Sequence, residues 1–138
     1  MIRPCTFGIE EEYLLVKLGS GQVPATPSPA VMGRCREALG RYFAQEMFRS
    51  QIELASPVFT NLYEAREFFQ RSRQRLRVAL AEEGMGPYAA ASHPCAAWLL
   101  QKPAAQGHYK QLFDDYRHVA RRSPVSYTHL RAHETRED

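Results

Sequence analysis

The sequence predicts an α+β domain in which a mostly antiparallel or mixed sheet is flanked by helices. Three observations support this prediction: two early segments alternate apolar and polar residues, both keep a polar face, and a long amphipathic segment follows them. Strands of parallel sheets are usually buried on both faces, so the polar faces favour an antiparallel arrangement. The order of strands and helices along the chain would also suit a parallel α/β sheet, and that alternative stays open here.

The first half of the chain contains two predicted strands and one predicted helix. A strand is expected at residues 7–18, where apolar and polar residues alternate. A stretch rich in glycine and proline is expected to be irregular up to Ala30, and residues 31–43 then have the spacing of a helix. Residues 47–54 alternate again, and Pro57 ends or borders this second strand.

The second half begins with the most regular helix of the chain. Asn61 is placed to cap residues 62–83, and Glu64 stands at the capping-box position three residues later. A short buried strand at residues 88–91 and a helix at residues 106–121 complete the prediction. The long helix is expected to bury a stripe of five apolar residues: Leu62, Ala65, Phe69, Leu76 and Leu80.

Size and composition indicate one globular domain. The 138 residues are 44% apolar and 11% aromatic, which is enough for a packed core. The formal net charge of +3 neither requires nor excludes an anionic partner such as a nucleotide. Three scattered cysteines argue against a disulfide framework or a zinc site, and no segment has the roughly 18–20 apolar residues of a membrane helix. We therefore expect a cytoplasmic protein without a membrane partner.

Three glutamates on the polar strand faces are candidate metal ligands. Glu10 and Glu12 share one face of the first strand because side chains alternate, and Glu53 occupies the polar face of the second. Such carboxylates suffice for a Mg²⁺ ion that also binds the phosphates of a nucleotide. The alternative interpretation is a solvated acidic run at the edge of a strand.

The residues beside Glu53 and one histidine are secondary candidates. Arg49 and Gln51 could hold phosphate or carboxylate oxygens, the arginine through bidentate contacts, and they could equally be surface residues. His93 precedes Pro94, which requires an extended backbone, and could orient a substrate or assist a proton transfer. A structural histidine bonded to the main chain is the alternative.

The long helix is rich in arginine and suggests a different class of function, a non-catalytic binding module. Such a basic surface could bind an anionic partner, including nucleic acid. Glutamates interrupt the same helix, and no aromatic residues interleave on its basic face. We therefore expect a solvated helix surface and no nucleic-acid partner. The arginines are Arg66, Arg71, Arg73, Arg75 and Arg77.

Three segments in order resemble the signature strands of a known family. Residues 7–16 (FGIEEEYLLV) resemble the opening strand of the carboxylate–amine ligases, also called the glutamate–cysteine ligase type 2 family. Residues 49–58 (RSQIELASPV) resemble the second signature strand, and residues 92–94 (SHP) followed by Trp98 are similar to a third. The resemblance extends over residues 7–122, with the motifs in the expected order and spacing.

The resemblance implies an incomplete catalytic domain related to that of glutamine synthetase, with metal and nucleotide ligands on an antiparallel sheet. It also implies that ATP phosphorylates a carboxylate, typically the γ-carboxylate of glutamate, and that an amine such as that of cysteine displaces the phosphate. In that scheme Glu10, Glu12 and Glu53 bind Mg²⁺ and ATP, with Arg49 and Gln51 as further contacts. A ligase of the same fold that joins glutamate to another amine is a further alternative.

The end of the chain departs from the family pattern. Residues 1–123 are interpreted as the N-terminal part of a ligase catalytic domain, because members of the family are much longer. Residues 126–138 (SYTHLRAHETRED) resemble a translated sequencing adaptor. We therefore interpret residues 124–138 as a non-native tail, and we expect the chain alone to be marginally stable and inactive, because a truncated sheet exposes an unpaired edge.

Overall fold

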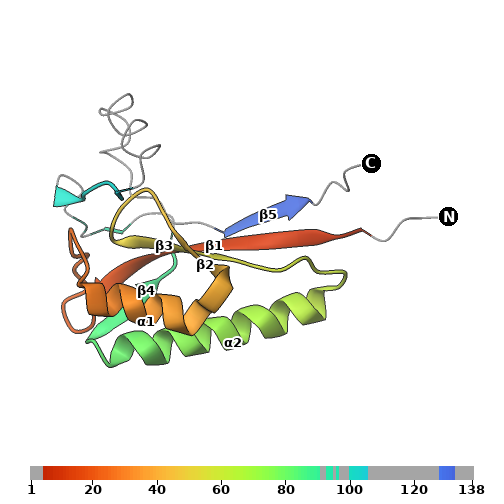
Figure 1. Ribbon diagram of the computed structural model, residues 1–138, viewed down its shortest axis with the longest axis horizontal. Coiled ribbons are helices and arrows are strands. Elements are labelled where there is room, and N and C mark those ends of the chain that lie inside the picture. The colour runs from red at the N-terminus through yellow and green to blue at the C-terminus, as the bar shows by residue number, and fades with distance from the viewer. Residues whose placement is uncertain (1–4, 91–92, 95, 97–99, 106–127, 133–138) are drawn as a thin grey trace.

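The computed structural model shows one antiparallel sheet with one face covered by two helices (Figure 1). The strand order is β2-β3-β1-β4, and β5 also pairs with β1. The predicted antiparallel sheet with flanking helices is thus confirmed, and none of the strand pairs within the described residues is parallel. The relation to the catalytic domain of glutamine synthetase stays a prediction. The residues that the structure describes are 5–90, 93, 94, 96, 100–105 and 128–132.

Within those residues the elements are five strands, two α-helices and one short 3₁₀ helix, η1. Neither α-helix is long and apolar enough to cross a lipid bilayer. In chain order the elements are β1 (Phe7–Lys17), α1 (Pro29–Leu39), η1 (Gly40–Tyr42), β2 (Phe43–Gln45), β3 (Gln51–Ala55), α2 (Leu62–Ala81), β4 (Met85–Tyr88) and β5 (Thr128–Ala132).

Strand β1 is central and uses both of its edges. One edge pairs with β3, with Glu12 directly opposite Glu53. The other edge pairs with β4 near Lys17 and with β5 near Phe7. Strand β5 falls in the segment that we interpret as a non-native tail. Its pairing does not reveal where that segment originates, so this interpretation stays a prediction.

Helix α1 begins and ends earlier than predicted. The Ser28 side chain accepts a hydrogen bond from the Val31 N–H at 3.2 Å, and Pro29 takes the first helical position, where its missing N–H costs nothing. Gly40, with φ of 55°, ends the helix. The helix predicted at residues 31–43 was therefore wrong at both ends, and its last residue begins strand β2.

Helix α2 matches its prediction closely. The Asn61 side chain accepts a hydrogen bond from the Glu64 N–H at 2.9 Å, as expected of a helix N-cap. Leu62, predicted to be buried, is exposed instead, because it shares the first, solvent-facing turn of the helix with exposed Tyr63. The other four predicted stripe residues are buried: Ala65, Phe69, Leu76 and Leu80.

The two remaining predicted strands are shifted along the chain. The strand expected at residues 47–54 begins only at Gln51, because the preceding residues form a turn closed by a 3.0 Å hydrogen bond from the Gln51 N–H to the Phe48 carbonyl. Strand β4 begins shortly after α2 ends and covers Met85–Tyr88. It therefore overlaps the strand predicted at residues 88–91 only at Tyr88. The helix expected at residues 106–121 lies outside the described residues.

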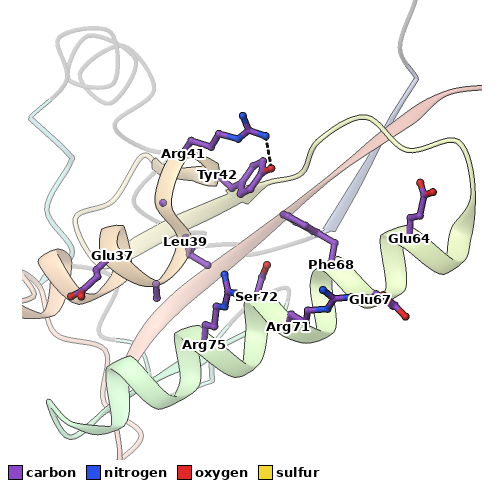
Figure 2. Close-up of a pocket in the computed structure, with 12 residues that line it drawn as sticks. Glu37, Leu39, Arg41, Tyr42, Glu64, Glu67, Phe68, Arg71, Ser72 and Arg75 are labelled. Atoms are coloured by element: carbon purple, nitrogen blue, oxygen red, sulfur yellow. Dashed lines mark hydrogen bonds and ion pairs between the residues drawn. The ribbon is translucent and has the colours of Figure 1, made fainter.

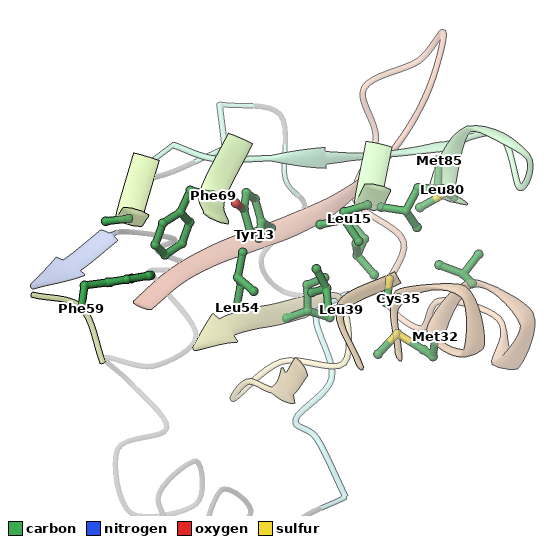
Figure 3. Close-up of a cluster of buried hydrophobic side chains, with 14 residues drawn as sticks. Tyr13, Leu15, Met32, Cys35, Leu39, Leu54, Phe59, Phe69, Leu80 and Met85 are labelled. Carbon is green, nitrogen blue, oxygen red and sulfur yellow. The ribbon is translucent and has the colours of Figure 1, made fainter. Parts of the chain in front are cut away.

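The main hydrophobic core lies between the sheet and the two helices (Figure 3). Strand β1 contributes Tyr13 and Leu15, and strand β3 contributes Ile52 and Leu54. Burial of one such aliphatic side chain is worth about 1.5–3 kcal/mol, so this face of the sheet is strongly specified. Glu12 and Glu53 therefore point to the opposite face. Four further buried apolar residues lie outside this cluster: Leu14, Val16, Phe48 and Ala104.

Candidate functional site: a carboxylate group on the sheet

Three glutamate side chains from three consecutive parts of the sheet converge. Glu12 lies on β1, Glu53 lies opposite it on β3, and Glu46 follows directly after β2. One carboxylate oxygen of each lies within 4.8 Å of the other two. Glu12 is buried, and Glu46 and Glu53 are half-buried. We call these three residues the carboxylate group, and oxygen atoms at this spacing suit the ligation of a divalent cation.

Two of the three predicted metal ligands, Glu12 and Glu53, belong to the carboxylate group. Glu10 lies on the same face of β1, but it pairs with Ala55 and is not one of the three. Its role as a ligand stays a prediction. Glu46 is not among the predicted ligands, because no strand was predicted between the helix at residues 31–43 and the strand at residues 47–54, where β2 lies. If the sequence had predicted a strand at residues 43–45, Glu46 would have been expected at its end, next to the strand that carries Glu53.

Gln51 contacts the carboxylate group through Glu12. Its side-chain nitrogen donates a hydrogen bond of 2.9 Å to Glu12 Oε2, and both side chains are buried. This bond fixes the orientation of one carboxylate. Arg49 lies in the turn between β2 and β3, where its Nε donates to the Pro103 carbonyl at 3.1 Å. The predicted contacts of both residues with a nucleotide stay predictions.

His93 lies against the end of strand β4. Its ring contacts that of Tyr88, with the centroids 4.7 Å apart. Tyr88 pairs with Leu14, which follows Glu12 by two residues on β1. The histidine therefore lies next to β1, the strand that carries Glu12, and its chemical role stays a prediction. Ser92 and Trp98 of the same motif lie outside the described residues.

Glu11, between the two predicted ligands of β1, faces the helices and is neutralised there. Arg73 of α2 donates to its carboxylate from Nε at 3.0 Å and from a terminal guanidinium nitrogen, and the Tyr13 hydroxyl donates to the same carboxylate. The Glu11 side chain is only 6% exposed. Burial, and then the hydrogen bond to Glu11, raise the pKa of Tyr13; the bond to Glu11 raises the pKa of Arg73.

The surroundings of Arg73 correct the expectation of a wholly solvated basic helix. Arg73 binds Glu11, and Arg71 pairs with Glu67 one turn earlier on the same helix. Two of the five arginines on the predicted basic surface therefore already have carboxylate partners. A glutamate at a core-facing position of a strand, two residues before a tyrosine, was the sequence signal for such a buried polar network.

A groove also lies between the two helices (Figure 2). It has a volume of about 520 Å³ and is lined by side chains of both charges. Arg71 pairs with Glu67, and Arg41 donates a hydrogen bond of 2.8 Å to the Tyr42 hydroxyl. The groove lies in the helix layer, whereas the carboxylate group faces away from it. We therefore do not assign it the cation chemistry.

Comparison with protein families and curated relatives gives a consistent result. The model of the glutamate–cysteine ligase family 2 (GCS2) matches residues 6–130. A relative from Pseudomonas putida and one from Pseudomonas entomophila, both named for glutamate–cysteine ligase 2, are 93% and 62% identical to this chain over 130 residues. Both alignments cover 94% of this chain, but only 35% and 34% of the relatives. The chain thus spans about a third of their length.

A solved structure shares the fold. The crystal structure of a bifunctional glutathione synthetase from Pasteurella multocida superposes with a TM-score of 0.71 at 22% sequence identity. The match covers 91% of this chain and 17% of that chain. At this level of identity the likeness concerns the arrangement of the sheet and helices.

Proposed function

Because this chain belongs to the glutamate–cysteine ligase family 2, we propose that it supplies the Mg²⁺–ATP carboxylates of an ATP-dependent carboxylate–amine ligase. The observation that carries the proposal is the convergence of Glu12, Glu46 and Glu53 within 4.8 Å on the sheet face opposite the helices. This face would be the catalytic face of a sheet like that of glutamine synthetase.

The donor set fits the proposed cation. Mg²⁺ takes oxygen ligands and usually binds one or two protein carboxylates together with the phosphates of its substrate. Glu12, Glu46 and Glu53 would hold it, with Glu10 as a further candidate on the same face of β1. Gln51 would keep the Glu12 carboxylate in place. The bound cation would neutralise charge on the phosphates during phosphoryl transfer.

The proposed reaction has two steps. The γ-carboxylate of glutamate attacks the γ-phosphorus of ATP, which gives an acyl phosphate and releases ADP. The amine of cysteine then attacks the acyl carbon and loses a proton, the bond between that carbon and the phosphate oxygen breaks, and inorganic phosphate leaves, so that an amide remains. None of the described residues identifies the amine, so a ligase that joins glutamate to another amine is the alternative within the same proposal.

The first test is Mg²⁺-dependent binding of ATP, measured by titration calorimetry. We expect Glu53→Gln to weaken this binding roughly tenfold or more, because it removes one charged ligand. The matched control is Glu64→Gln, which makes the same change at the exposed start of α2 and should leave binding intact. Binding without Mg²⁺ that depends steeply on salt and is lost on neutralising Arg71 and Arg75 would favour the basic-helix module instead.

The second test concerns the complete reaction. Resequencing the gene across codons 122–138 shows whether the reading frame continues, and the longer product is then assayed for ADP release that requires both glutamate and an amine. We expect the 138-residue chain alone to bind Mg²⁺–ATP without turnover, since it spans about a third of its relatives. Turnover by the chain alone would contradict this expectation.

A further inference from the structure

An open surface pocket of about 560 Å³ lies where α1 meets the turn between β2 and β3, and no acidic side chain lines it. Its charged lining consists of Arg36 from α1 and Arg49 from the turn. Gln45 at the end of β2 and Thr26 add polar groups, whereas prolines, alanines and Met32 form apolar walls. We call this hollow the arginine cavity.

Both arginines are anchored at one point each. The Arg36 guanidinium lies 5.2 Å from the centre of the Phe43 ring, which is a cation–π contact. The Arg49 Nε donates to the Pro103 carbonyl at 3.1 Å. Within the part of the chain that the structure describes, neither guanidinium forms an ion pair with a carboxylate. Their terminal N–H groups therefore remain available to an anionic ligand.

Other arginines of the helix layer have different surroundings. Arg34, Arg71 and Arg73 each form an ion pair with at least one glutamate. Arg41 and Arg75 also form no ion pair within the described residues, but the groove that they line contains three glutamates. The arginine cavity differs from that groove because it has two arginines and no acidic side chain. The first turn of α1, which contributes Pro29 to the cavity, also has no acidic residue. The positive end of the helix dipole adds to the positive potential there.

The turn that carries Arg49 is held rigidly. The Gln45 side-chain nitrogen donates to the carbonyls of Phe48 and Gln51 at 2.9 and 2.8 Å, which closes the turn. The Arg49 N–H donates to the Lys102 carbonyl at 2.9 Å and fixes the turn against the segment 100–105. A ligand would therefore meet Arg49 in a prearranged position, which lowers the entropic cost of binding.

We propose that the arginine cavity binds an anionic group of a small molecule, a carboxylate or a phosphate, between Arg36 and Arg49. Both anions present several oxygens that accept hydrogen bonds from guanidinium N–H groups. The turn that contributes Arg49 also carries Glu46 of the carboxylate group, so one structural unit serves an anion site and the proposed cation site. Anion binding here does not require the ligase reaction, so either proposal can fail while the other holds.

The test uses the 138-residue chain and two probes, inorganic phosphate and glutarate, each titrated at constant ionic strength. Binding is followed through the arginine Nε–Hε signals in NMR spectra. Arg36→Met and Arg49→Met should each weaken binding about tenfold, since a hydrogen bond to a charged group is worth roughly 1.5–3 kcal/mol. The control Arg41→Met removes the same charge from η1, where Arg41 lines the groove between the helices, and should change nothing.

The outcomes separate a built site from a general response to charge. Saturable binding of either probe that is lost in both cavity variants supports the proposal, and the tighter probe identifies the anion. An equal loss in Arg41→Met, or no binding of either probe, overturns it. Where a methionine variant does not fold, the lysine variant, which keeps the charge but loses the planar fork, should still weaken binding. Glu53→Gln should retain anion binding, which separates this result from a failure of the proposed function.

Discussion

Glu11 and Glu12 are neighbours on β1, yet their carboxylates have opposite surroundings. Glu11 faces the helices, where Arg73 and Tyr13 bind its carboxylate. Glu12 faces away from them, and Glu46 and Glu53 bring two further carboxylates within 4.8 Å of it. Glu11 is thus bound by a cation of helix α2, whereas Glu12 lies within a group of three carboxylates. Gathering like charges costs stability, so the second arrangement is typical of a binding site.

The largest effect on stability is expected from a substitution on the face of the sheet that the helices cover, which we call the helix face. Arg73→Met should lower the free energy of unfolding by about 3 kcal/mol, the lower end of the range for breaking a buried pair, because Arg73 itself is 57% exposed. The cost arises from Glu11, whose buried carboxylate loses its counterion. Urea denaturation at neutral pH measures it. Glu11→Gln should cost less, since it leaves no buried charge, and a larger loss for Glu11→Gln than for Arg73→Met would contradict this account.

On the other face of the sheet, a substitution is expected to stabilise the protein instead of destabilising it. In the absence of divalent cations, Glu53→Gln should raise the free energy of unfolding by about 0.5 kcal/mol, because it removes a like charge directly opposite Glu12. Mg²⁺ at ten times its dissociation constant should stabilise the unaltered chain by about 1.4 kcal/mol, and a tenfold weaker affinity should reduce this gain to about 0.4 kcal/mol in the variant. Thermal unfolding with EDTA and with MgCl₂ measures both effects. A Glu53→Gln variant that is less stable in EDTA would show that Glu53 has a structural role instead.

The two faces also differ in how far the sequence could predict them. Alternation along β1 correctly separates Glu12 from Glu11, because side-chain direction in a strand is a local property. Glu46 and Arg73 reach the same strand only through tertiary structure: Glu46 follows a three-residue strand, and Arg73 is 62 residues away from Glu11. A strand of three residues is too short for periodicity to reveal. Helical spacing does place Arg73 in the gap of the buried stripe between Phe69 and Leu76, but no local pattern identifies Glu11 as its partner.

An alkaline pH series probes the helix face further. Burial raises the pKa of Cys35 to about 11, and burial together with Glu11 raises that of Tyr13. Both groups therefore stay neutral up to a higher pH in the folded chain than in the unfolded one. Their contribution to stability is therefore complete below pH 9 and is lost as pH rises through the folded pKa values, by at most about 1.4 kcal/mol per pH unit for each group.

Substitutions on the two faces should respond differently to this series. Tyr13→Phe should make the fall of stability above pH 10 less steep, and Cys35→Ala should do so from pH 9. Glu53→Gln should leave the slope as it is, because its face contributes neither group. Urea denaturation at each pH gives the slopes. A Tyr13→Phe variant with an unchanged slope would show that this hydroxyl ionises equally in the folded and unfolded chain.

A small effect, similar in size to that of Glu53→Gln without divalent cations, is expected at a second arginine, which serves as the matched control for Arg73. Arg34 joins α1 to the end of α2 through Glu82 at 3.0 Å and Glu83 at 3.5 Å. Ion pairs between exposed side chains are worth about 0–1 kcal/mol, so Arg34→Met should cost about 0.5 kcal/mol, and less in high salt. The same urea series measures it.

Arg34 and Arg73 are similarly exposed, at 43% and 57% of their side chains, and what differs is the burial of the carboxylates that they bind. A large difference between the two methionine variants would therefore isolate the burial of Glu11 as the cause. Equal losses of stability would mean that the ion pair between Arg73 and Glu11 stabilises the protein no more than the exposed ion pairs of Arg34 do. The contrast between the two faces of β1 would then rest on the carboxylate group alone.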